Sequence, residues 1–268
     1  MTSSKQLSVV MIAQDEQERI EQSILSCMHV ADEIVVVDGG SKDNTVQIAE
    51  RLGCRVIHHA FEGYAKQRNF AADQAVHDWI FFIDADEIVS KPLALSIMKW
   101  KENKEEETAA YAVYRIGNFL NKWFEQGEYL VRLYHRKRVK INDTHVHERP
   151  DVEEDKTGQL EGVLWHNGFR SIEDHVQRFN RYTKLEAEQA YEQKQKFHMV
   201  NMLWRPPAKF VQKYMVHQLY KKGVAGFAVA VFWSYYEFMK QIKLYEKYMP
   251  SSSLASKRGR EEVKVANK

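Results

Sequence analysis

The first 90 residues of the chain alternate between short apolar runs and segments in which apolar residues recur at helical spacing. Apolar runs rich in Val, Ile and Phe predict buried β-strands, and the segments between them predict helices. Near-continuous apolar strands that alternate with helices are typical of a parallel, doubly wound α/β sheet. Strands are expected at 7–12, 33–38, 55–58 and 79–84, and helices at 45–52 and 64–76.

The fourth of these apolar runs leads directly into three carboxylates, Asp84, Asp86 and Glu87. The carboxyl ends of strands form the edge at which open α/β folds bind ligands. If the strand continues through them, Asp84 and Asp86 point the same way and can face one divalent cation. Carboxylate oxygens suit magnesium or manganese, often with a diphosphate completing the coordination shell. The alternative is an acidic turn that only ends the strand.

Two other strands deliver acidic residues to the same predicted edge. The first strand ends at Asp15 and Glu16, and the second ends at Asp38, followed by two glycines. The Asp38 carboxylate can accept a hydrogen bond from a nucleobase N–H or a ribose hydroxyl. Lys66 and Arg68, near the start of the preceding helix, can neutralise phosphate charge. This set predicts a pocket for a nucleoside diphosphate whose departure is assisted by a cation.

The pattern changes after residue 110. Further strands are expected at 112–116, 129–134 and 162–166, and Ser171 with Asp174 forms a capping arrangement that opens a helix to about residue 194. The sequence is expected to divide into a nucleotide-binding half, a half that would bind an acceptor (the acceptor half), a helical segment and a disordered tail. The expected boundaries are 1–110, 111–200, 201–250 and 251–268.

The segment 201–250 is basic, aromatic and amphipathic, with an expected break at Arg205-Pro206-Pro207. Its uncharged run, 223–236, is shorter than the roughly 20 residues that a spanning helix needs. Such a segment suits the surface of an anionic membrane. The alternative is a pair of helices packed on the acceptor half or on a second subunit.

Composition narrows the class of protein. The net charge of +2 gives no argument for a nucleic-acid partner, and we expect none. The two cysteines have no paired spacing, which fits a reducing cytosol and predicts neither a disulfide framework nor a zinc site. The polar residues 1–6 lead directly into a strand, so no signal peptide is expected. The oligomeric state is not predicted.

Four motifs in register resemble the family 2 glycosyltransferases, which have the GT-A fold, a Rossmann-like α/β fold with a mixed sheet. They lie at 8–16, 36–45, 65–69 and 82–87. The resemblance implies that Asp15 and Asp38 meet the nucleotide base, Arg68 the diphosphate region, and Asp86, aided by Asp84, a Mg²⁺ or Mn²⁺ ion. The full set of implied nucleotide-sugar-binding residues is Ala13, Asp15, Glu16, Asp38, Lys66, Arg68, Asp84, Ala85 and Asp86.

A narrower likeness, at 131–136, 146–148, 165–169 and the basic segment, is to bacterial lipopolysaccharide-core β-glucosyltransferases. It implies inverting transfer of a hexose, expected to be glucose, from a UDP-sugar to a lipid-linked glycan such as the lipopolysaccharide inner core. The expected location is cytoplasmic, peripheral on the inner face of the cytoplasmic membrane. Another cell-surface polysaccharide or a polyprenyl phosphate is the alternative acceptor. The family more often has Asn at Asp15 and Asp at Gly39, which leaves the nucleotide preference open, with uridine as the default.

Inverting transfer needs a base that deprotonates the acceptor hydroxyl. Glu148 is the expected base, and the alternative is an ordinary salt bridge to Arg149. His147 is expected to orient that carboxylate or contact the acceptor. Arg132 and His166 are expected near the acceptor or the pyrophosphate, and for His166 a purely structural role is the alternative.

Four other classes of protein share parts of this pattern. A haloacid dehalogenase-type phosphatase also uses Asp-x-Asp after an apolar strand, but on the first strand of its fold, whereas three strands precede Asp84 here. The turn at 13–16 has neither the glycine fingerprint of a dehydrogenase nor the glycine-rich basic loop of a nucleotidyltransferase. A non-catalytic membrane scaffold would not need the full acidic set.

Overall fold

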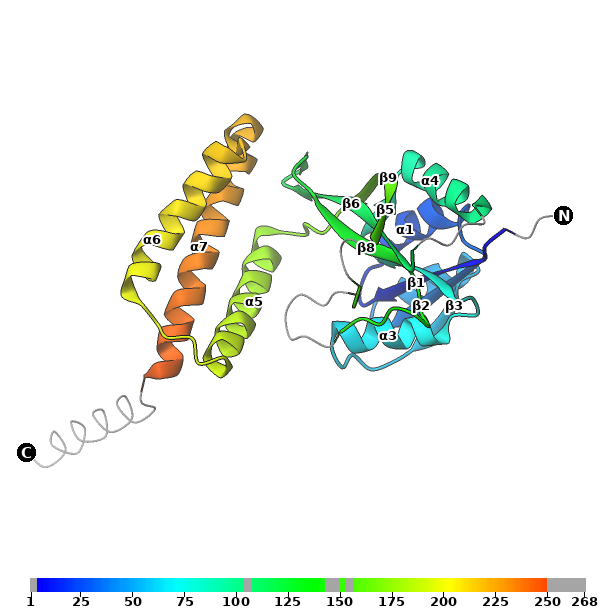
Figure 1. Cartoon of the computed structure of the whole chain (residues 1–268), viewed down its shortest axis with the longest axis horizontal. Helices are drawn as coiled ribbons and strands as arrows, with labels where there is room; N and C mark the ends of the chain where they lie inside the picture. Colours follow the sequence, from blue (N-terminus) through cyan, green and yellow to red (C-terminus); the bar gives the residue numbers. More distant parts are fainter. Residues whose placement is uncertain (1–3, 104–107, 143–149, 153–156, 250–268) are drawn as a thin grey trace, which may run out of the picture. The chain divides into compact units, whose positions relative to one another are not determined.

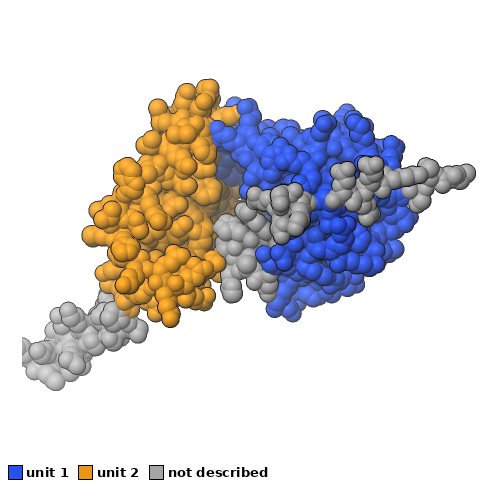
Figure 2. Space-filling view, in the orientation of Figure 1, with its two compact units in different colours: residues 1–170 blue, residues 171–268 orange. Residues whose placement is uncertain are grey.

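The computed structural model describes residues 4–103, 108–142, 150–152 and 157–249. The chain forms two compact units, Met1–Arg170 and Ser171–Lys268 (Figure 2).

The first unit contains one mixed sheet (Figure 1). Four parallel strands occupy one side, and β8 joins them antiparallel to β4. The short strand β7 (Lys122–Trp123) extends β6 as a hairpin. Strands expected from the second half of the sequence therefore belong to the same sheet as those from the first. The order across the sheet is β3 (Arg55–His58), β2 (Glu33–Asp38), β1 (Leu7–Ala13), β4 (Trp79–Asp84), β8 (Glu128–His135), β6 (Ala110–Phe119), β9 (Thr157–His166) and β5 (Glu87–Val89).

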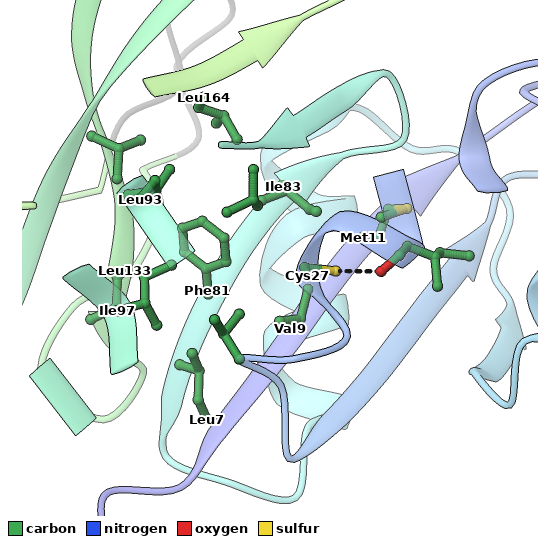
Figure 3. Packing of buried hydrophobic residues seen from close by; sticks show 14 of the residues in the cluster. Leu7, Val9, Met11, Cys27, Phe81, Ile83, Leu93, Ile97, Leu133 and Leu164 are labelled. Carbon is green, nitrogen blue, oxygen red and sulfur yellow. Dashed lines mark hydrogen bonds between the residues drawn. The ribbon is translucent and has the colours of Figure 1, made fainter. Parts of the chain in front are cut away.

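Apolar side chains bury both faces of the central strands. Phe81 and Ile83 of β4 belong to one hydrophobic cluster, shown in Figure 3, and Ile80 and Phe82 belong to a second. This confirms the prediction of a strand buried on both sides. Helices α1 and α4 contribute to the first cluster and α3 to the second. The helices of this unit are α1 (Ile20–Cys27), α2 (Thr45–Arg51), α3 (Tyr64–Gln74) and α4 (Lys91–Glu102).

The acidic stretch after β4 is a turn. The strand ends at Asp84, Ala85 and Asp86 form the turn, and β5 begins at Glu87. The backbone N–H of Asp84 donates to Oε2 of Glu87 at 3.0 Å, so the buried Glu87 carboxylate closes the turn. The condition under which Asp84 and Asp86 would point the same way is not met, because the strand does not continue through them.

The second unit consists of three long helices, with α7 packed against both α5 and α6. The hydroxyl of Ser171 accepts a hydrogen bond from the N–H of Asp174 at 3.0 Å, which confirms the predicted cap of α5. Across the unit, Tyr236 donates to Glu186 at 2.5 Å. The helices are α5 (Ile172–Glu192), α6 (Met199–Val211) and α7 (Gly223–Tyr248), with a π-helical turn (Gln212–Val216) and a 3-10 turn (Leu219–Lys222) before α7.

The expected break at Arg205-Pro206-Pro207 is wrong, because both prolines lie inside α6. A proline in a helix interior removes a backbone hydrogen bond and normally costs about 3 kcal/mol. Here Pro206 is buried, and its carbonyl accepts a hydrogen bond from the hydroxyl of Ser234 on α7 at 2.8 Å. This hydrogen bond connects the proline-containing part of α6 to α7. Among the described helices, none is both long enough and apolar enough to cross a membrane.

Candidate active site

The Asp84 carboxylate lies between two guanidinium groups at the carboxyl end of β4. Its Oδ1 is 3.4 Å from Nη2 of Arg68, and its Oδ2 is 3.1 Å from Nη2 of Arg132. Burial alone would raise the pKa of Asp84, but the charges of Arg68 and Arg132 outweigh it and hold the pKa well below its ordinary value. Asp84 is therefore ionised and serves as a counter-ion to both arginines.

Glu87 is fully buried next to Asp84 and Arg132. Its Oε1 accepts from Arg132 at 2.6 Å and lies 3.4 Å from Nη1 of Arg115, while its Oε2 accepts from the backbone N–H of Asp84. Burial would lower the pKa of Arg132, but Glu87 and Asp84 together raise it. No role is predicted for Glu87 from the sequence. Its only signal in the sequence was a third carboxylate next to an apolar run.

The ring of Phe82 supports both arginines from the side of the sheet. The Cζ atoms of Arg68 and Arg132 lie 4.6 Å and 5.0 Å from its ring centroid. Cation–π contacts of this kind contribute about 0.5–2 kcal/mol each. The side chains of Asp84, Glu87 and Phe82 thus fix two positive charges at the end of β4.

Asp86 meets His166, the last residue of β9. Their Oδ2 and Nε2 atoms are 3.4 Å apart, and the N–H of Asn167 donates to the carbonyl of Asp86 at 2.8 Å. Burial would raise the pKa of Asp86, but the hydrogen bond and charge of His166 lower it. Burial would likewise lower the pKa of His166, and Asp86 reverses that effect and raises it. The structure brings together two residues that the sequence places 80 positions apart.

Of the two glycines next to the His166 ring, one makes room for it. A Cβ atom at Gly168 would lie 2.4 Å from Nε2 of His166, well inside van der Waals contact. A Cβ at Gly117, on the neighbouring strand, would lie 3.9 Å from Nδ1, an ordinary contact distance. Gly168 is thus required for the imidazole to reach Asp86, whereas Gly117 is not.

The family resemblance implies a divalent cation, and the residues at this turn fit one in part. Among the described residues no group of three or more His, Cys, Asp or Glu side chains is placed to hold a metal ion. Asp86 and His166 supply one carboxylate and one imidazole, both partly accessible. A cation held by these two groups needs its other ligands from a diphosphate or water, as is usual for Mg²⁺. Asp84 is engaged with Arg68 and Arg132.

The loops after β1 and β2 are tied together by the acidic residues expected to contact the base. Asp15 has a left-handed backbone (φ 55°), and its N–H donates to the hydroxyl of Ser41 at 3.0 Å. Its Oδ1 accepts from the N–H of Lys42 at 2.8 Å. The buried Asp38 accepts from the N–H groups of Gly40 and Ser41, at 3.0 and 3.1 Å. It also lies 3.0 Å from Nδ1 of His58.

Glu16 connects the loop after β1 to the segment after β9. Its carboxylate forms ion pairs with Nε of Arg19, at 3.1 Å, and with Arg170. Arg19 also donates to the carbonyl of Asn167 at 3.1 Å. Burial raises the pKa of Glu16, the nearby Asp86 adds to that rise, and both arginines oppose it. These contacts hold the chain beside His166 against the first loop.

The other sequence candidates are less closely placed. Lys66 is exposed, and its Nζ lies 3.6 Å from Glu62, so it is not part of the Asp84 cluster. Ala13 is buried at the end of β1, and its carbonyl accepts from the N–H of Gly39 at 2.9 Å. Glu148 and His147 lie outside the described residues.

Comparisons with known proteins show the family of the chain. Residues 8–158 match the family model for glycosyl transferase family 2. An uncharacterized glycosyltransferase of Rickettsia typhi is 29% identical over 265 residues, which cover 93% of this chain and 90% of that protein. The lipopolysaccharide core biosynthesis glycosyltransferase LpsC of Rhizobium meliloti is 27% identical over 251 residues, covering 90% and 93%.

The fold comparison points the same way. The solved structure of a mycobacterial protein is similar with a TM-score of 0.50 at 18% identity, covering 70% of this chain and 74% of that one. The family match includes the four parallel strands and the turn that carries Asp84 and Asp86. The mixed α/β sheet and the helical carboxyl-terminal segment confirm the expected fold class. The chain belongs to glycosyl transferase family 2 and has the GT-A fold.

Proposed function

We propose that this glycosyltransferase moves a hexose, most simply glucose, from a UDP-sugar to a lipid-linked glycan, with inversion at the anomeric carbon. The observation that carries the proposal is the pairing of Asp86 with His166 beside the Arg68–Asp84–Arg132 cluster, at the carboxyl end of β4. A cation site next to fixed positive charge is what a departing nucleoside diphosphate requires.

The arginine cluster supplies N–H donors for the diphosphate. Arg68 and Arg132 share Asp84, and Arg132 and Arg115 share Glu87. The exposed Glu128 also pairs with Arg115, so three guanidinium groups face three carboxylates. The buried Nε of Arg132 has no hydrogen-bond acceptor among the described residues. A phosphate oxygen is a suitable acceptor, because charge-assisted bonds from arginine to phosphate are strong. Arg68 and Arg132 are therefore the residues that we assign to the diphosphate.

Asp86 and His166 are the residues that we assign to a Mg²⁺ or Mn²⁺ ion. Asp84 supports them without binding the ion directly, because Arg68 and Arg132 engage its carboxylate. A bound divalent cation stabilises negative charge on the leaving diphosphate. The protein's own part is to keep Asp86 ionised and His166 beside it, through the carbonyl contact with Asn167 and the space left by Gly168. His166 must lose its proton before it can bind a metal.

We assign the nucleoside to the carboxyl ends of β1 and β2, at Ala13 and Asp38, and to the loop after β1, which contains Asp15. Glu148 remains our proposal for the base that deprotonates the acceptor hydroxyl. His147, which precedes it in the sequence, remains our proposal for the residue that orients it or contacts the acceptor. The lipopolysaccharide inner core is the acceptor we favour, because the chain is similar to LpsC over most of its length. A polyprenyl phosphate or another cell-surface polysaccharide is the alternative. The proposed location is the inner face of the cytoplasmic membrane.

Asp86→Ala tests the catalytic proposal. We expect transfer from UDP-glucose to fall at least 100-fold, and Mn²⁺-dependent binding of UDP, measured by calorimetry, to be lost while the circular dichroism spectrum is unchanged. Lys99→Ala is the control, because Lys99 is an exposed residue of α4 to which no part of the site is assigned. Substantial transfer by Asp86→Ala would refute the metal assignment. Wild-type protein that binds no UDP with Mn²⁺ would instead favour a non-catalytic scaffold.

A further inference from the structure

Helix α6 has apolar side chains on two opposite faces. The inner face packs on α7, where Pro206 is buried and the rings of Phe210 and Phe227 lie 5.8 Å apart. The outer face carries a stripe at positions i, i+4, i+7 and i+11, which the π-helical turn after α6 continues at i+15. The members of this outer stripe are Val200, Trp204, Pro207, Val211 and Met215, all exposed.

The apolar side chains of the outer stripe are more exposed than those of a helix at an aqueous surface usually are. Val200 is 73% exposed, Trp204 68% and Met215 56%. Helices at an aqueous surface normally place polar residues on the outer face. Contiguous exposed apolar side chains mark a surface that binds something. Further exposed apolar residues flank the stripe or follow it, namely Met199, Leu203, Val216, Tyr220 and Val224.

The charges around the stripe have one sign. No Asp or Glu occurs between Glu192 and Glu237. The same interval contains Lys194, Lys196, Arg205, Lys209, Lys213, Lys221 and Lys222. An apolar stripe in a segment whose acidic and basic residues are all of the basic kind is complementary to a surface with anionic headgroups above an apolar interior.

We infer that the outer stripe of α6 lies in the headgroup region of an anionic bilayer, with the helix parallel to the membrane plane. The 13 residues of α6 give a length of about 20 Å, which is less than the roughly 30 Å of hydrocarbon that a spanning element must cross. Trp204 is the central anchor, since tryptophan favours the interface. Arg205 and Lys209 contact the phosphates.

A second copy of the chain is a poorer occupant of the same surface. A two-fold interface places the same patch of each copy against the other. The basic residues beside the stripe would then face one another with no acidic residue in the interval to neutralise them. An anionic lipid surface removes that repulsion, because each basic side chain near it contributes about 1 kcal/mol of attraction.

This inference rests on the membrane location in the proposed function, and not on its chemistry. Vesicle sedimentation tests it without a sugar nucleotide. The vesicles are phosphatidylcholine alone, or phosphatidylcholine in which about one lipid in three is phosphatidylglycerol. We expect the whole chain to bind only the anionic vesicles. The double variant Trp204→Asp with Val211→Asp should bind at least tenfold more weakly. Leu95→Asp, at an exposed apolar position on α4, is the matched control and should bind like wild type.

Quenching by lipids brominated on their acyl chains locates the inserted residue. Six tryptophans contribute to the fluorescence, so Trp204→Phe is compared with wild type. We expect Trp204→Phe to keep vesicle binding and to lose most of the quenching. Equal quenching of the two proteins, or binding that does not depend on the anionic lipid, overturns the assignment. So does a wild-type dimer in light scattering that the double Asp variant converts to monomers, because a second copy would then cover the stripe.

The two proposals fail separately. If the vesicle results are as expected but no protein hydrolyses or transfers from a sugar nucleotide, the chemistry is wrong and the membrane surface stands. If transfer to a soluble acceptor fragment is present and unchanged in the double Asp variant, but vesicles are not bound, the membrane inference is wrong and the chemistry stands.

Discussion

Replacing Glu87 by Gln removes one charge from the buried cluster behind Asp84 and preserves the volume of the side chain. The side chain is 0% exposed, and its carboxylate contacts Arg132 at 2.6 Å and Arg115 at 3.4 Å. The amide retains one acceptor oxygen but adds two N–H donors next to guanidinium groups that are themselves donors. The variant therefore leaves Arg132 with a single anionic partner, Asp84.

The expected loss of stability follows from the cost of a broken buried ion pair. Removing one partner of such a pair costs about 3–5 kcal/mol. Because Asp84 still lies 3.1 Å from Arg132, we expect the lower end, about 3 kcal/mol in the free energy of unfolding. For a domain of the size of the first unit, that corresponds to a fall of about 6–12 °C in melting temperature.

Urea denaturation of the intact chain measures this loss, and Glu128→Gln is the matched control. Glu128 pairs with the other side of Arg115 at 2.5 Å but is 56% exposed, so its removal should cost about 0–1 kcal/mol. We also expect Glu87→Gln to weaken UDP binding, since Arg132 loses its anchor. If the two variants differ by less than about 0.5 kcal/mol, the cluster does not act as a buried ionic network.

Two further predictions concern His166 and the second unit. Gly168→Ala should displace the His166 ring and weaken Mn²⁺-dependent UDP binding about tenfold or more, whereas Gly117→Ala should bind UDP like wild type; equal effects in calorimetry would contradict the steric argument. Burial, aided by the charge of Arg178, lowers the pKa of His175. Just below the ordinary histidine pKa, the unfolded chain therefore binds more protons than the folded chain. The stability that comes from neutral His175 is complete above a pH of about 6.5 and is lost as the pH falls toward the pKa of the folded state. In a plot of melting temperature against pH, His175→Gln should flatten the curve below a pH of about 6.5. A wild-type curve that is already flat in this range would refute the assignment.

The strands could be predicted because their signal is local. Between Trp79 and Ile83 every residue is apolar, and a strand buried on two faces needs nothing else to be recognised. The same holds for the cap at Ser171, where the donor at Asp174 is three residues away. Bounds and burial of such elements follow from residues within a few positions of one another.

The site could be predicted only in part because its contacts are long-range. The turn that separates Asp84 from Asp86 depends on Glu87, whose partner Arg132 is 45 positions later. No local pattern reveals that Asp84 faces arginines. His166 was a candidate because it ends a predicted strand, but its partner, Asp86, depends on the pairing of β9 with β5. The predicted break at the prolines of α6 was wrong for the same reason, because Ser234, which contacts Pro206, lies 28 residues away.

The position of β9 has a consequence for exchanging segments between relatives. Arg132 comes from β8 and His166 from β9, yet both contact the β4–β5 turn that belongs to the first 90 residues. A chimera joined near residue 110 would combine an Asp86 from one parent with a His166 from another. A one-residue slip of β9 would place Trp165 opposite Glu87 instead. Crossover points that keep the Arg132–Asp84 and Asp86–His166 pairs within one parent therefore lie after Arg170, where the first unit ends, and not between the two parts of the sheet.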